Sequence, residues 1–90
     1  GRLVKATMMC SVIATANDVV RISLGLNGVS LNETHMDVKA TQGVTHREVV
    51  STMGIIQLAA DDIVGGMLAN ETSTDNITMH DCVLIIETLS

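Results

Sequence analysis

Hydrophobic and polar residues alternate along the first part of the chain. From Val4 onward every second residue is apolar, whereas the residues between them include Lys5 and Ser11. A period of two places these sets on opposite faces of a β-strand, because successive side chains of a strand point to opposite sides. The pattern predicts a strand over residues 3–14. Its apolar face comprises Val4, Ala6, Met8, Cys10, Val12 and Ala14.

A second alternating segment is followed at once by a turn signal. Residues 15–18 include Asn and Asp and indicate a turn, after which apolar and polar residues alternate from Val20 to Leu26. Asn27-Gly28 comes next, and both of its residues tolerate the positive φ that a type I′ hairpin turn demands. We therefore predict that the chain reverses at Asn27-Gly28.

The returning segment, residues 29–41, changes the parity of its apolar positions. Leu31 belongs to one parity and Met36 to the other. The switch around Asn32-Glu33 implies a β-bulge or a break in this strand. Gln42-Gly43 then marks the next turn.

Residues 46–60 fit either a strand or a helix. The apolar side chains satisfy a period of two, but some also lie at helical spacing, namely Val49, Met53, Ile56 and Ala60. Gly54 and the β-branched residues disfavour a helix, so we predict a strand and keep the helix as the alternative. Asp61-Asp62 indicates the turn that follows.

The last third of the chain predicts two more strands separated by a loop. Residues 63–69 and 77–89 are largely apolar, and the run of Asn, Glu, Thr, Ser and Asp over 70–76 predicts a solvated loop. The sum is about six strands joined by short polar turns, without a convincing crossover helix. Short strands at regular spacing are typical of an all-β, antiparallel sandwich or barrel.

Both faces of the last strands are apolar. Val83 and Ile85 have one parity, and Leu84 and Ile86 have the other. A two-layer domain of this size buries one face of each sheet, so a second apolar face needs another cover. A second copy of the chain is the simplest cover, because large apolar patches are rare on monomers. We expect an oligomer interface formed by Met53, Ile55, Met67, Leu84 and Ile86.

Composition and charge disfavour several classes of function. The 90 residues are 47% hydrophobic but contain no Phe, Trp, Tyr or Pro, so base stacking and aromatic cages lack their rings. The formal charge is −5 and the five basic residues are scattered, so we expect no nucleic-acid partner. Apolar runs such as 82–86 are far shorter than the roughly 18 to 20 residues that span a bilayer. We expect no membrane insertion and no export signal.

The sequence contains little candidate chemistry. Cys10 and Cys82 form neither a metal motif nor a disulfide framework, and the usual fate of free Cys predicts two reduced, buried side chains. A disulfide between Cys10 and Cys82 remains the alternative if the first and last strands are neighbours. His35, His46 and His80 have no partner at metal-site spacing, and no Gly-x-Ser-x-Gly elbow is present. We expect a non-enzymatic protein with no catalytic residue, no metal and no cofactor.

Three segments of the chain match the architecture of a known family. They are residues 20–29, residues 54–63, and the loop 70–78 followed by 82–86. From Asn17 onward the chain resembles the trimeric jelly roll of the complement and tumour-necrosis-factor-like superfamily, especially its short phage and bacterial versions. In such domains the three segments would be a strand ending in an Asn-Gly hairpin, a strand running into a corner, and a polar loop before the C-terminal strand.

The resemblance implies a structural or adhesive role. Such modules form threefold knobs on phage fibres, capsid decorations and spore or cell surfaces, so we expect a homotrimeric, jelly-roll-like sandwich on a virion or extracellular surface. Its partners would be copies of itself, other virion proteins or a host surface receptor. Exposed loops often carry such contacts, and the expected contact residues are Asn70, Glu71, Thr72 and Asp75. Because the family's usual first strands are missing, residues 1–90 would be a single domain from the C-terminal part of a longer chain.

Two other classes of function remain as alternatives. Residues 27–31 together with 45–50 are similar to parts of peptide-binding PDZ domains, and residues 44–50 could open the helix of a ubiquitin-like fold. A peptide-binding module would add a ligand strand to an exposed sheet edge, and a monomer with a helix over 46–60 would favour it. A small enzyme is the other alternative, and it would need a titratable residue with a strongly shifted pKa in a deep cleft.

Overall fold

Two antiparallel β-sheets make up the structure, a computed structural model that describes residues 1–43 and 46–90. The described residues form seven strands, which confirms the all-β sandwich predicted from the sequence. The strands are β1 (Arg2–Ile13), β2 (Val19–Leu26), β3 (Val29–Ser30), β4 (Met36–Lys39), β5 (Glu48–Leu58), β6 (Val64–Asn70) and β7 (Thr78–Thr88). A short 3₁₀ helix, η1 (Asn32–Thr34), connects β3 to β4.

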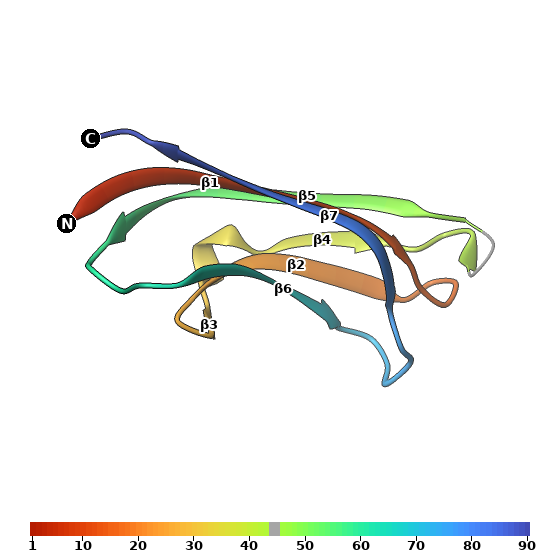
Figure 1. Cartoon of the computed structure of the whole chain (residues 1–90). Helices are drawn as coiled ribbons and strands as arrows, with labels where there is room; N and C mark the ends of the chain where they lie inside the picture. Colours follow the sequence, from red (N-terminus) through yellow and green to blue (C-terminus); the bar gives the residue numbers. More distant parts are fainter. Residues whose placement is uncertain (44–45) are drawn as a thin grey trace.

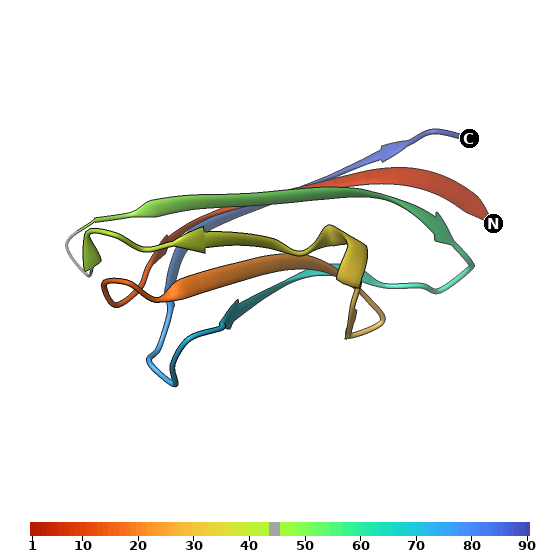
Figure 2. The same cartoon turned by 180° about the vertical axis from the view of Figure 1, so that it is seen from behind.

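The strands are divided between a sheet A and a sheet B. Sheet A has the order β5-β1-β7, and sheet B has β2 at its centre. β6 pairs with one edge of β2, whereas β3 and then β4 pair with the other edge. Figure 1 shows the sheets as two layers, with both ends of the chain at the same end of the molecule. In the view from behind, β4 and η1 lie below β5 (Figure 2).

η1 divides the third predicted strand in two. It occupies the position around Asn32-Glu33 where the sequence predicted a bulge or a break. The Thr34 hydroxyl donates to the carbonyl oxygen of Leu31 at 2.7 Å and accepts from the backbone N–H of Leu24 at 2.9 Å. The Thr34 carbonyl oxygen accepts a hydrogen bond from the Thr52 hydroxyl. Thr34 thus connects η1 to both sheets. Because η1 divides one predicted strand into β3 and β4, the described residues form seven strands instead of the six predicted.

The segment that fitted either a strand or a helix forms β5, as predicted. β5 pairs with β1 along its full length, so the helical alternative is wrong. Gly54 lies opposite Ala6 on the inner face of this strand. A Cβ atom at Gly54 would lie 2.7 Å from Thr34 Cγ2, which is shorter than a real contact. The glycine therefore lets η1 approach the sheet closely.

The turns lie where their residues predicted them. Asn27 and Gly28 have φ values of 52° and 82°, the left-handed conformation that a type I′ turn needs at both central positions. Asn17, Gly43 and Asp61 also have positive φ values, of 72°, 69° and 68°. Asn, Asp and Gly tolerate this conformation better than other residues, which explains why the chain turns at these positions.

The core lies between the middle of sheet A and β2. Ile22 and Leu24 of β2 are 0% exposed, as is Val50 of β5. The apolar face predicted for residues 3–14 is buried as a set: Val4, Ala6, Met8, Cys10, Val12 and Ala14. The period of two in the sequence therefore identified the inner face of β1 correctly.

β7 lies beside this core and buries none of its residues. All eleven residues of the strand are exposed, although it pairs with β1 over most of its length. The reason is an offset between the sheets, because β2 and β4 pack against β5, on the far side of β1 from β7. Both apolar faces of β7 consequently remain open to solvent.

The two cysteines form a disulfide between the first and last strands. Cys10 and Cys82 lie directly opposite each other in the β1–β7 pair, with their Cα atoms 4.2 Å apart. The prediction of two reduced, buried cysteines is therefore wrong. The sequence alone does not show that the first and last strands, β1 and β7, are neighbours. Cys10 is buried as predicted, whereas Cys82 is exposed.

Candidate functional site

The outer face of sheet A, the face turned away from sheet B, carries a group of exposed apolar side chains. Cross-strand pairing places Thr7 between Met53 and Ile85, and Met9 beside Val83. The exposed fractions range from 43% for Met9 to 70% for the neighbouring Val49. The large apolar side chains of this face are Met9, Val49, Met53, Ile55, Val83 and Ile85.

Charged residues flank this face at both ends. Lys5 lies between Ile55 and Glu87 at one end. Asp81 lies at the other end, where its carboxylate is 3.7 Å from Arg47 Nη1. An apolar centre with a charged margin is the usual arrangement of a protein–protein interface. A continuous apolar patch on a sheet face marks an interaction surface more often than a solvated one.

The residues predicted for the oligomer interface are distributed over three surfaces. Met53 and Ile55 lie together on the outer face of sheet A. Leu84 and Ile86 lie on the opposite face of the same sheet, because they pair with the buried residues Met8 and Ala6. Met67 lies on the outer face of sheet B. It pairs there with Ser23, whose direction is opposite to that of the core residues Ile22 and Leu24.

Other residues of the outer face were not included in the predicted interface. Met9 is an apolar residue among the polar positions of the alternating segment 3–14, and that exception was the available signal. Val83 and Ile85 were recognised as one of two apolar faces of the last strand, but the sequence does not say which face sheet B leaves open. Val49 gave no comparable signal, because the segment around it was apolar at both parities.

Asp18, which immediately precedes β2, holds the predicted contact loop in place through hydrogen bonds. Asn70 Nδ2 donates to Asp18 Oδ2 at 2.8 Å, and the Ser73 hydroxyl donates to the same oxygen at 2.9 Å. The Thr72 hydroxyl donates to Asp18 Oδ1 at 3.1 Å. Asn70 Nδ2 also approaches the carbonyl oxygen of Asp75 at 3.1 Å. Asn70 and Thr72 therefore order the loop as well as lying at its surface.

Glu71 belongs to a small ionic network on the outer face of sheet B. Its carboxylate is 2.9 Å from Arg21 Nη1. The same guanidinium binds both oxygens of Asp37, through Nε at 2.8 Å and Nη2 at 3.1 Å. The network ties the start of the loop to β2 and β4. It leaves the charge of Arg21 already matched by two carboxylates, so it is a poor site for a further anion.

Acid should loosen the loop that Asp18 holds. The hydrogen bond from Asn70, followed by that from Ser73, lowers the pKa of Asp18 below its ordinary value of 3.8, although burial opposes them. Because the pKa is lower in the folded chain than in the unfolded one, ionised Asp18 stabilises the fold at pH values above the ordinary pKa. This contribution is lost as the pH falls through the folded pKa. We expect the free energy of unfolding to decrease below about pH 4.

The variant Asp18→Asn tests this expectation, because it keeps the shape of the side chain and removes its ionisation. Urea unfolding between about pH 5 and pH 2 should show a smaller loss of stability than in the wild type. Some acid dependence should remain, since hydrogen bonds from Arg21 and Asn27 lower the pKa values of Asp37 and Asp62. An unchanged pH dependence in Asp18→Asn would show that the loop does not depend on this carboxylate.

The three histidines belong to different segments of the chain. His35 Nε2 is 2.9 Å from the Ser30 hydroxyl, which is 2.8 Å from the Ser23 hydroxyl. In the described part of the chain, no three His, Cys, Asp or Glu residues gather closely enough to hold a metal ion. His46 and His80 are exposed, on other elements.

Comparisons with protein-family models, curated proteins and solved structures found no match for this chain. Among the residues that the structure describes, no helix is long and apolar enough to cross a membrane. The features of the molecule that bear on its function are the two open faces of sheet A and the loop at Asp18.

Proposed function

We propose that this chain is a structural or adhesive module that assembles as a homotrimer through the outer face of sheet A. The observation that carries the proposal is the group of large apolar side chains on that face, from Met9 to Ile85, with charges at its margin. Fully burying a side chain of this size contributes about 1.5–3 kcal/mol, so several of them favour association strongly. The same side chains left in water provide no stabilisation.

The threefold stoichiometry and the location follow from the resemblance to trimeric jelly rolls. The two-sheet architecture is compatible with such a fold. The Cys10–Cys82 disulfide supports a virion or extracellular location, because disulfides persist in oxidising environments and on virion or cell surfaces. In this proposal the outer face binds copies of the chain, and the exposed loop that contains Glu71 and Asp75 contacts a host receptor or another virion protein.

Solution mass tests the proposal directly. Light scattering of the wild type over a range of concentrations should give the mass of three chains. The double variant Met53→Lys/Ile85→Lys places charge in the apolar centre and should give the mass of one chain, with an unchanged β-type circular dichroism spectrum. A matched control is Val29→Lys, because Val29 is 67% exposed but lies on β3, which pairs with β2 of sheet B. This control should retain the trimer.

Two results would contradict the proposal. One is a wild type that remains a single chain at every concentration. The other is a Met53→Lys/Ile85→Lys variant that keeps the wild-type mass, which would move the interface to another surface.

Peptide binding is the second candidate function, and the structure limits where on the chain a peptide could bind. Residues 48–58 form β5, so the helix that a PDZ-like or ubiquitin-like module would place there is not formed. A peptide site on this chain would instead have to use a free strand edge, and β7 provides one.

A further inference from the structure

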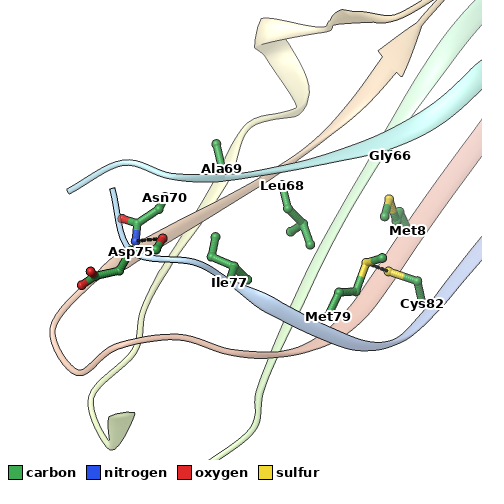
Figure 3. Close-up of a pocket in the computed structure, with 9 residues that line it drawn as sticks. All are labelled: Met8, Gly66, Leu68, Ala69, Asn70, Asp75, Ile77, Met79 and Cys82. Atoms are coloured by element: carbon green, nitrogen blue, oxygen red, sulfur yellow. Dashed lines mark hydrogen bonds between the residues drawn. The ribbon is translucent and has the colours of Figure 1, made fainter. Parts of the chain in front are cut away.

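A cleft of about 500 Å³ opens between β6 and β7, on the side where the two sheets diverge. Its apolar lining comes from both sheets, with Met8 of β1 and Leu68 of β6 facing Ile77 and Met79 (Figure 3). Asn70 and Asp75 lie at one end, and the exposed Cys82 lies on the β7 wall. The cleft is continuous with the hydrophobic core and is a separate surface from the outer face of sheet A.

Both walls of the cleft are edge strands. Among residues 1–43 and 46–90, β6 pairs only with β2, and β7 pairs only with β1. The Cα atoms of Cys10 and Cys82 are 4.2 Å apart, the short separation typical of a non-hydrogen-bonded antiparallel pair. The backbone N–H and C=O of Cys82 therefore point away from β1, toward the free edge. By the alternation of the ladder, so do those of Leu84 and Ile86.

The same residues of β7 have apolar side chains on the cleft side. Leu84 is 39% exposed and Ile86 is 47% exposed, and both extend the apolar lining beyond the cleft along the strand. Open backbone groups and open apolar side chains on one long strand are the two requirements for adding another strand. An added strand would gain ladder hydrogen bonds and would cover Leu84 and Ile86 with its own alternate side chains.

Charge indicates the chemistry of the added strand. The residues lining the cleft include one acid, Asp75, and no base. Asp81 and Glu87 flank the apolar run of β7, with the exposed bases Arg47 and Lys5 beside them, and the whole chain keeps a formal charge of −5. In a second copy paired antiparallel about Leu84, Asp81 would lie opposite Glu87 of the other copy, and like charges directly opposite each other are destabilising. In that register, a strand with basic ends fits the free edge better than β7 of another copy.

We propose that the free edge of β7 and the adjoining cleft bind an extended peptide segment of another protein. The segment has apolar residues at alternate positions and a Lys or Arg at each end. It adds a fourth strand to sheet A, with its apolar residues over Leu84 and Ile86 and its basic residues near Asp81 and Glu87. This site shares Asp81 and Glu87 with the charged margin of the outer face, whereas its apolar contacts, Leu84 and Ile86, lie on the opposite face of β7.

A labelled synthetic peptide, Lys-Val-Thr-Val-Thr-Val-Lys, provides the probe. Fluorescence anisotropy should show that it binds the wild-type chain, and that the same peptide with Glu at both ends binds at least about tenfold more weakly. Leu84→Ser should weaken binding of the Lys peptide about tenfold or more, because a large apolar contact is lost. Val83→Ser is the matched control on the opposite face of β7 and should leave the peptide affinity unchanged.

Amide hydrogen exchange locates the added strand. The Lys peptide should slow exchange at Cys82, Leu84 and Ile86, whose N–H groups face the free edge. It should have little effect at Val83 and Ile85, whose N–H groups already face β1. This alternation is not expected from a peptide that sits on a sheet face without extending the ladder.

Several results would overturn the proposal. They are the absence of binding by the Lys peptide, equal affinity for the Glu peptide, and equal weakening by Leu84→Ser and Val83→Ser. If Leu84→Ser lowered the solution mass and no peptide bound, the edge would be an interface between copies instead. Peptide binding and solution mass are separate readouts, so failure of either the peptide site or the trimer can be recognised without the other.

Discussion

Replacing both Cys10 and Cys82 with Ser should lower the free energy of unfolding by on the order of 4 kcal/mol, because the disulfide closes a loop with a sequence separation of 72. The disulfide restricts the unfolded chain, and its removal restores that entropy. The effect should be a large part of the total, since small domains are stable by only about 5–15 kcal/mol. Urea unfolding of the double variant and of the oxidised wild type measures the difference.

The loss of stability in the double variant should affect β7 before it affects the rest of the fold. β7 buries no residue and, in the part of the chain that the structure describes, has only β1 as a strand partner, so its attachment depends on that ladder and on the disulfide. Amide exchange in the variant should therefore become faster in β7 than in β2. Wild type treated with a reductant should behave like the double variant. A change in unfolding free energy below about 1 kcal/mol would contradict this role for the disulfide.

Leu24→Ala should destabilise the fold by about 2–5 kcal/mol, the usual cost of removing a fully buried Leu side chain and leaving a cavity. Leu24 is 0% exposed, and its Cδ1 atom lies 3.3 Å from the place where a Cβ on Gly54 would be. The side chain therefore fills the space between the two sheets beside η1. Equilibrium unfolding in urea provides the measurement.

Ile63→Ala is the control for this prediction. It removes an apolar side chain that is 71% exposed, so it should change the free energy of unfolding by less than about 0.5 kcal/mol. Similar losses in Leu24→Ala and Ile63→Ala would show that the sheets do not pack around Leu24 as described.

The two proposed surfaces use opposite faces of the same strand. Val83 and Ile85 point to the outer face of sheet A, where we propose copies of the chain to meet. Leu84 and Ile86 point toward the cleft side, where we propose a peptide strand to add. This arrangement accounts for the unusual composition of β7, which is apolar at both parities yet buries nothing within its own chain.

Much of the fold could be predicted because it depends on local sequence. The alternation over 3–14 identified the inner face of β1, and Asn27-Gly28 identified a type I′ turn. Gly54 and its β-branched neighbours favoured a strand where helical spacing offered an alternative. Each of these signals arises from the conformational preferences of residues that are close in the chain, so the sequence is sufficient to read them.

The same local sequence signals were not sufficient to predict the candidate sites. The five residues predicted for the interface include pairs from both faces of sheet A, because alternation tells which residues share a face but not which face sheet B covers. The loop over 70–76 was expected to be solvated, and residues 71–76 are exposed. Its fixation by Asp18 was not foreseen, since Asp18 and Asn70 are far apart in the chain and meet only through the pairing of β2 with β6.

The sequence by itself determined the strands, the turns and the two apolar faces of the last strand, because these follow from the period of two and from local backbone preferences. Only the tertiary structure decided that β7 pairs with β1, that Cys10 therefore meets Cys82, and that sheet B packs toward β5 and leaves β7 uncovered. The physical reason is that strand neighbours and sheet offset are set by contacts between distant segments. No local pattern encodes which of several apolar strands will lie side by side.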